Sequence, residues 1–129
     1  MKFTQQRQEG VNVIRRYGAD FIVVAEQEIR ASCIVGVNTI VPWAPRSVDE
    51  LTTEHLPALF ELAPEVVVLA TGATQKFPRA ALRAEFATRR IGLEVMEIGA
   101  AARTYNVLVS EERRVLAAVL LPGPAKRSE

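Results

Sequence analysis

The sequence predicts a mixed α/β fold, and three observations support this prediction. The first third of the 129-residue chain holds short β-rich runs at the spacing of an antiparallel meander. From Pro64 onward, apolar strand patterns alternate with helical patterns, as they do in α/β units. No repeat, low-complexity tract or interdomain linker divides the chain, so residues 1–129 are expected to form one domain. A chain of this length buries roughly two-thirds of the surface that its unfolded form exposes, which is enough for a packed core.

Three β-rich runs open the chain, at residues 11–17, 21–24 and 29–35. The third run alternates between an apolar face formed by Ile29, Ala31, Cys33 and Val35 and a polar face formed by Glu28, Arg30 and Ser32. This period predicts a half-solvated strand. Cys33 is then expected in the core, because no His or basic neighbour in the sequence suggests an activated thiolate.

A turn at residues 36–38 leads into a short strand at residues 39–41, which Pro42 ends because it lacks a backbone N–H. Trp43 follows in a loop between two prolines. A single Trp in this setting is expected to plug one end of the core rather than to stack on a ligand.

A helix is expected next, with Thr53 as its N-cap and a sheet-facing apolar stripe formed by Leu56, Leu59, Phe60 and Ala63. His55 lies on the opposite side of the first turn. We expect it to be solvated, because the sequence shows no partner for it.

The second half of the chain alternates strands with helices. Residues 66–70 are almost wholly apolar, as expected of a strand that is buried on both faces. A loop at residues 71–76 leads to a helix that starts at Pro78 and ends near Gly92. The remaining predictions are a strand at residues 93–96, a helix at residues 99–110, a strand at residues 115–121 and a disordered tail from about residue 123.

Two strand-to-helix turns, at residues 70–76 and 96–100, lie side by side if the strands before them are parallel neighbours. Ligands of open α/β sheets bind at this carboxyl edge, where the free N–H groups of helix starts favour anions. The candidate ligand-binding residues at this edge are Thr71, Gly72, Thr74, Lys76, Arg103 and Thr104.

A structural interpretation of the same residues stays open. Thr71 and Thr74 can form turn and capping bonds, Gly72 can supply a positive φ, and Lys76 can simply be solvated. Asn106 has enough hydrogen-bonding capacity to tie the turn at residues 70–74 to its helix. We therefore assign structural bracing roles to Asn106, Trp43 and Arg113, the last within a charged surface turn formed by residues 111–114.

Charge and composition argue against several classes of function. Sixteen Lys and Arg against fifteen Asp and Glu leave a net charge of +1, so no strong field attracts nucleic acid or anionic lipid. One cysteine and one histidine give neither an intramolecular disulfide nor a zinc cluster, so no metal or other cofactor is expected. No nucleophile with its base and no carboxylate pair in an apolar pocket can be assembled, which favours a protein that is not an enzyme.

Hydropathy and the first residues predict a cytoplasmic protein. No segment approaches the roughly 18 consecutive apolar residues of a membrane-spanning helix. The opening residues MKFTQQRQEG lack the apolar core of a secretory signal and are too short and too mixed in charge for a mitochondrial presequence.

Three segments together resemble the Mth-type family of domains of unknown function. They are Val41-Pro42-Trp43, residues 66–72 with a turn similar to the family's Gly-Thr-Gly, and residues 95–115 with Ala-Ala, Arg-Thr-Tyr-Asn and Glu-x-Arg-Arg elements. The family also includes a mitochondrial assembly factor of respiratory complex I and an adipogenesis-associated protein. The resemblance implies a three-layer fold in which a mixed central sheet carries helices on one side and an additional β layer from the amino-terminal half.

The family positions that match are Thr71, Gly72, Ala100, Ala101, Thr104, Asn106 and Arg113. Three positions differ: Ala70 replaces the first glycine of Gly-Thr-Gly, Ile98 replaces a threonine, and Glu112 replaces a glycine. The first two changes remove backbone freedom and a hydroxyl from the predicted crevice.

The resemblance to an assembly factor and the lack of a catalytic set favour a non-catalytic module that binds another protein, whose identity the sequence does not give. The alternative is a small-molecule protein or enzyme with an anionic ligand at the carboxyl edge. A homo-oligomer that uses an exposed sheet edge or an apolar patch is a third hypothesis.

Overall fold

The computed structural model describes residues 10–123 and contains two β-sheets. The expected disordered tail lies outside the described residues. An antiparallel sheet is formed by β1 (Ile14–Gly18), β2 (Phe21–Val24) and β3 (Gln27–Ile29). The second sheet has the order β5-β4-β8-β6-β7, with β4 (Ala31–Gly36), β5 (Thr39–Pro42), β6 (Val66–Ala70), β7 (Gly92–Met96) and β8 (Val115–Pro122).

The five-stranded sheet is mixed, as predicted. Its central strand β8 pairs antiparallel with β4 and parallel with β6, and β6 pairs parallel with β7. Within residues 14–122 the helices are α2 (Pro57–Phe60), α3 (Ala80–Thr88) and α4 (Ile98–Ser110), together with two short 3-10 helices, η1 (Val48–Glu50) and η2 (Thr53–His55). The mixed α/β class, the mixed sheet and the additional amino-terminal β layer are thus confirmed.

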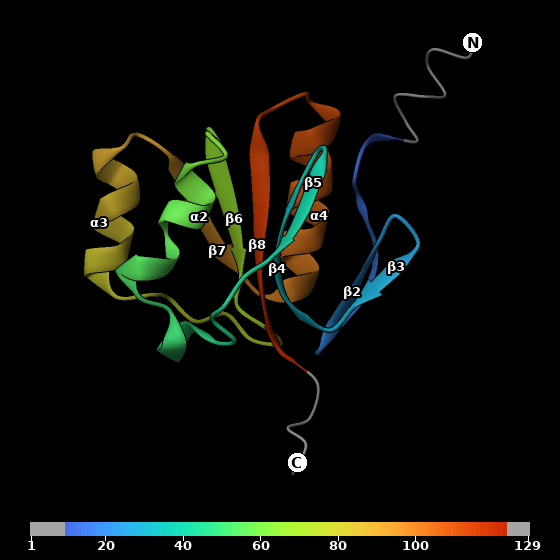
Figure 1. The fold of residues 1–129 in the computed structure, drawn as a ribbon, viewed down its shortest axis with the longest axis horizontal. Helices are drawn as coiled ribbons and strands as arrows, with labels where there is room; N and C mark the ends of the chain where they lie inside the picture. The colour runs from blue at the N-terminus through green and yellow to red at the C-terminus, as the bar shows by residue number, and fades with distance from the viewer. Residues whose placement is uncertain (1–9, 124–129) are drawn as a thin grey trace.

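Helices cover both faces of the five-stranded sheet, so the expectation of helices on one side is wrong. One face packs against α4 and the β1–β3 sheet, and the other packs against α2 and α3 (Figure 1). We call the two cores the α4-side core and the α3-side core. The connection through α3 runs outward from β6 to β7, and the connection through α4 runs back past β6 to β8. Because both crossovers are right-handed and run in opposite directions, their helices lie on opposite faces of the sheet.

The run predicted as one half-solvated strand at residues 29–35 belongs to two sheets. It divides at Arg30, after which β4 is buried on both faces because β5 and β8 flank it and both cores cover it. Cys33 lies in the α4-side core, as predicted, and burial raises the pKa of its thiol to about 12.

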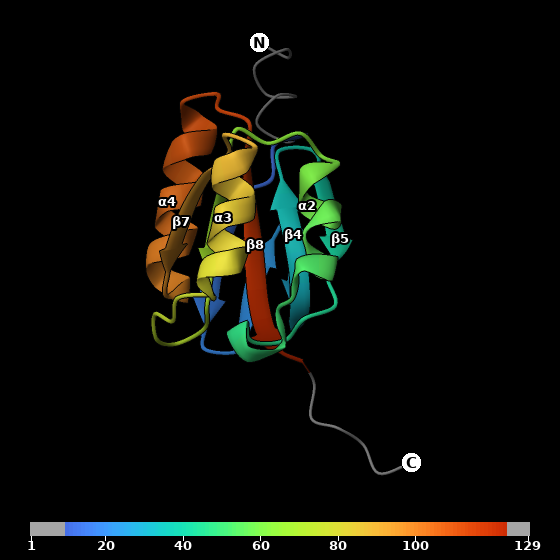
Figure 2. The ribbon, with the colours of Figure 1, turned by 90° about the vertical axis from the view of Figure 1, so that its left-hand side faces the viewer.

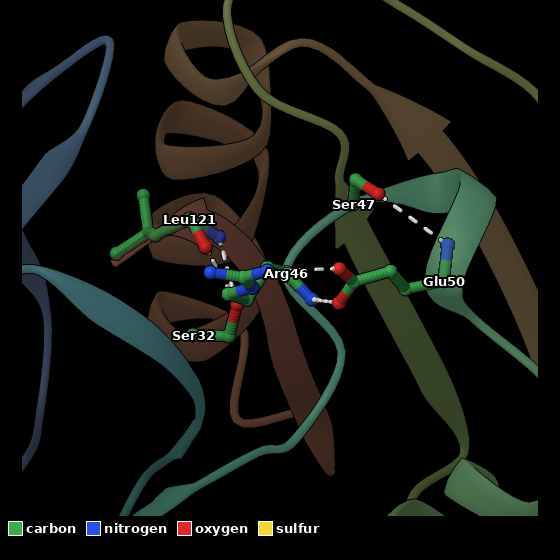
Figure 3. Close-up of polar contacts among 5 residues, drawn as sticks. All are labelled: Ser32, Arg46, Ser47, Glu50 and Leu121. Atoms are coloured by element: carbon green, nitrogen blue, oxygen red, sulfur yellow. Dashed lines mark hydrogen bonds and ion pairs between the residues drawn. The ribbon is translucent and has the colours of Figure 1, made fainter. Parts of the chain in front are cut away.

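Ser32, on the supposed polar face, is also buried, and its hydroxyl takes the place of a backbone partner. The register between β4 and β8 shifts between Ala31 and Cys33. There the Ser32 hydroxyl accepts a bond of 2.8 Å from Leu121 N and donates one of 3.1 Å to Leu121 O (Figure 3). Figure 3 also shows Glu50, the last residue of η1, which accepts hydrogen bonds from Arg46 N and Nη2.

The single helix predicted after Thr53 is instead η2 followed by the four-residue α2. Pro57 is the first residue of α2, and because it lacks a backbone N–H it prevents one continuous helix from forming. The N-cap is Thr52, and the backbone N–H of Thr52 donates to His55 Nδ1 at 3.0 Å, so His55 is half-buried in a capping box rather than freely solvated. The later helix α3 begins at Ala80, two residues after the predicted Pro78.

Candidate functional site

The predicted carboxyl edge has the expected backbone arrangement. The parallel register pairs Ala70 with Met96, so the turns that follow β6 and β7 lie next to each other. Thr71 N donates to Met96 O at 3.0 Å, and Ile98 N donates to Gly72 O at 2.8 Å. The two turns are therefore bonded directly to one another.

Bonds within the loop use the Thr71 side chain. Its hydroxyl donates to Thr74 O at 2.7 Å and accepts from Lys76 N at 3.1 Å. Gly72 has a φ of +103°, which favours glycine, whereas the Lys76 side chain is exposed. Within this loop, the Thr71 hydroxyl bonds and the positive φ of Gly72 define the backbone path.

Glu97, which the sequence analysis did not single out, occupies the helix start that an anionic ligand would use. Its carboxylate accepts 2.7 Å and 2.9 Å bonds from the backbone N–H groups of Gly99 and Ala100. These two bonds, that of Gly99 first, hold the pKa of Glu97 below its usual range. A carboxylate immediately before an apolar helix is a recognisable capping signal, and it satisfies the groups that would otherwise attract an anion.

Arg103 extends toward the amino-terminal sheet rather than toward the turns. Its Nη1 donates to the Tyr17 hydroxyl at 3.3 Å, and both side chains are exposed. Tyr17 lies against Gly99, where a Cβ atom would stand 2.8 Å from the tyrosine oxygen. The small residue at the start of α4 thus lets β1 approach closely.

Asn106 does not brace the turn at residues 70–74, so that expectation is wrong. Its Oδ1 accepts from Ile14 N and its Nδ2 donates to Ile14 O, both at 2.9 Å. Nearby, the buried Tyr105 hydroxyl donates to Asn12 O at 2.8 Å. These contacts fasten the amino-terminal segment to α4, because β1 packs on the same face of the central sheet as this helix.

The other two residues with predicted bracing roles lie in different regions. Arg113 Nε donates to Glu65 Oε2 at 2.7 Å, and Arg114 N donates to Glu65 Oε1 at 3.2 Å. Both bonds lower the pKa of Glu65 and join the starts of β6 and β8. Trp43 is buried in the α3-side core, and its Nε1 donates to His55 O at 3.0 Å.

A cavity of about 480 Å³ is lined by Pro64 and Val115, where β6 and β8 begin, so it lies at the opposite end of the sheet from the predicted site. We call it the amino-edge groove. Among its lining residues are Val11, Val37, Leu62, Pro64, Val109 and Arg113. They come from separate loops and one helix end, so no local sequence pattern could have identified this groove.

A second cavity, of about 420 Å³, lies between α3 and the edge strand β7. We call it the α3–β7 groove, and its lining residues are Phe77, Arg83, Phe86, Ala87, Ile91, Leu93, Glu94 and Val95. Neither groove is lined by any of the six candidate ligand-binding residues. Of those six, four share the loop after β6, while Arg103 and Thr104 lie on α4.

Within residues 10–123, no group of three or more His, Cys, Asp or Glu side chains is placed to hold a metal ion. No helix in this described part of the chain has the length and apolar character needed to cross a membrane. The thiol of Cys33 is buried, and the ring of His55 is engaged in a helix cap.

Comparison with known proteins gives consistent results. The family model described as "Protein of unknown function (DUF498/DUF598)" matches residues 14–120. The chain is 32% identical over 123 residues to the Danio rerio protein named NADH dehydrogenase [ubiquinone] 1 alpha subcomplex assembly factor 3, covering 94% of this chain and 70% of that protein. It covers 60 to 62% of the proteins of the same name from Xenopus tropicalis, Bos taurus and Mus musculus.

Solved structures agree with the fold. A Xanthomonas campestris protein determined by NMR superposes with a TM-score of 0.82 at 38% identity, covering 92% of this chain and 90% of that one. A Bordetella pertussis protein described as a Mth938-like domain gives a TM-score of 0.75 at 25% identity, covering 87% of each chain.

Proposed function

We propose, because this chain belongs to the protein family of unknown function DUF498/DUF598, that it is a non-catalytic module that binds another protein in the manner of an assembly factor. The observation that carries this proposal is the 32% identity to an assembly factor over 94% of the chain. That match extends over nearly all of the chain, so it includes most of both sheets rather than an isolated motif.

The geometry of the polar residues supports a binding role over a catalytic one. Thr71, Glu97 and Asn106 all use their side chains in bonds that shape the fold. The single cysteine is buried as a thiol, with its pKa raised to about 12. We place the module in the cytoplasm. We expect its partner to be a protein rather than a nucleic acid, since the net charge of the chain is only +1.

An affinity pull-down with the tagged full chain in its own cells tests this proposal. We expect specific retention of one or a few proteins, and we expect the purified candidate to form a complex of fixed stoichiometry with the chain. Retained subunits of respiratory complex I would extend to this chain the role that its relatives' names describe. A folded bait that retains nothing above an unrelated bait of similar charge would contradict the proposal.

A thermal-shift screen with phosphate, nucleotides and carboxylates tests the same proposal from the other side. A ligand at 100 times its dissociation constant adds roughly 2.7 kcal/mol to stability. We expect no such shift. A shift that Lys76→Ala or Arg103→Ala removes would show that the carboxyl edge binds a small anion instead.

A further inference from the structure

Among the strands of residues 10–123, β7 forms one edge of the five-stranded sheet and pairs with β6 alone. Figure 2 shows β7 at the left-hand edge of the five-stranded sheet, between α3 and α4. The α3–β7 groove lies along this edge. An edge strand carries backbone groups that can pair with another chain.

The backbone of β7 is oriented for such pairing. Gly92 N donates to Glu65 O, and Met96 O accepts from Thr71 N, so these residues face β6. In a parallel pair the alternate residues point the other way, which directs the backbone groups of Leu93 and Val95 to the open edge. The bond of 2.8 Å from Gln75 Nε2 to Val95 O, made from outside the sheet, agrees with this orientation.

Apolar side chains accompany these backbone groups. Leu93 and Val95 are partly buried on the α3 side, and Ile91 continues the same apolar surface. Phe77 is 63% exposed, the largest exposed fraction among the exposed large apolar residues of the described chain. An aromatic ring exposed beside an open strand offers a contact for an apolar side chain of a partner.

The segment that runs from the loop before α3 to β7 carries a net positive charge. Residues 76–94 hold five cations, Lys76, Arg79, Arg83, Arg89 and Arg90, against Glu85 and Glu94, which leaves eleven cations and thirteen carboxylates for the rest of the chain. The described ion pairs all lie outside this segment. Of these charged residues, Arg83 and Glu94 line the groove together with Phe77, whereas Arg79 donates to Leu51 O and Arg89 stacks on the Phe60 ring.

We propose that the α3–β7 groove docks an extended, acidic segment of a partner protein, which adds as a strand beside β7. Its backbone pairs with Leu93 and Val95 and displaces the Gln75 side chain from Val95 O. Its apolar side chains pack on Phe77 and Leu93, and its carboxylates approach Arg83 in the groove and Lys76, the residue before Phe77. This inference rests on the proposed protein-binding function and specifies the chemistry of the partner. The open strand edge favours a peptide over nucleic acid or lipid, since neither of these supplies a strand.

Selection of short random peptides on the immobilised full chain tests the inference. We expect the selected sequences to alternate apolar residues with Asp or Glu, and we expect a selected peptide to shift the amide resonances of Leu93 and Val95. The double variant Lys76→Glu/Arg83→Glu should weaken binding by about tenfold or more, measured by fluorescence anisotropy. The matched control Arg15→Glu/Arg16→Glu, with the same charge change on β1, should stay within about twofold of the wild type.

Three outcomes would overturn the inference. They are the selection of no peptides or of basic ones, equal weakening by the two double variants, and resonance shifts that leave β7 unchanged. Tight binding of phosphatidylserine vesicles that an acidic peptide does not compete with would also overturn it, in favour of a membrane surface. The selection does not depend on what the pull-down retains, so failure here leaves the proposed function standing.

Discussion

Asn106 uses both halves of its side-chain amide on one residue, Ile14, and so acts toward β1 as a neighbouring strand would. Its burial in an apolar helix predicted a hydrogen-bonding role, and the structure has one. The partner lies 92 residues away, and no local pattern in the sequence indicates that distance. The type of role was therefore predictable from the residue, whereas its target depended on the packing of the two sheets.

Replacing Asn106 with alanine should lower the free energy of unfolding by about 1–3 kcal/mol, because the Ile14 N–H and C=O lose their partners in a half-buried site. Urea unfolding followed by circular dichroism measures this change. Ser110→Ala, on the same helix, removes an exposed bond to Val107 O and should cost less than about 0.5 kcal/mol. Equal losses in the two variants would contradict the bracing role.

At the scale of elements, all three strands of the second half were predictable from the sequence, whereas the sheet faces that the helices cover were not. Continuous apolar runs identified β6 and β8 because both are buried on both faces. The faces of α3 and α4 depend on strand order, since β7 lies outside β6 whereas β8 lies inside it. Strand order is a long-range property that the residues of one element do not encode.

The cap of α4 should make stability depend on pH. Folding lowers the pKa of Glu97, so its contribution is present at neutral pH and is lost as the pH falls through the lowered value. The loss of stability in Glu97→Gln should therefore be largest near neutrality and shrink below about pH 4. Urea unfolding across this range measures it, with Glu61→Gln as the control for removing one exposed charge. A difference that stays constant with pH would contradict the capping role.

For the whole molecule, the two cores share the strands β4, β6 and β8, whose side chains alternate between them. Because the same strands contribute side chains to both cores, we expect the disruption of one core to destabilise the other. The candidate grooves also belong to this scale. The amino-edge groove combines segments that are distant in sequence, and the α3–β7 groove lies between a helix and a strand edge. Neither arrangement leaves a local sequence motif, so the motifs predicted a site at the carboxyl edge instead.

Both cores should unfold in one transition. Trp43 fluorescence reports on the α3-side core, and the reactivity of Cys33 toward a thiol reagent reports on the α4-side core. We expect the two signals to change over the same range of urea concentration, as in a two-state domain of this size. Midpoints that differ beyond experimental error would show that the cores unfold separately.

The position of β8 also affects the order in which the protein forms during its synthesis. β8 is the last of the described strands along the chain, yet it lies between β4 and β6 and is the strand that joins the β4–β5 pair to the β6–β7 pair. Until residues 115–122 are synthesised, the strand that joins the apolar inner edges of β4 and β6 is missing. Such unpaired edges are sites of aggregation. We therefore expect the chain to be most prone to aggregation before residues 115–122 are synthesised.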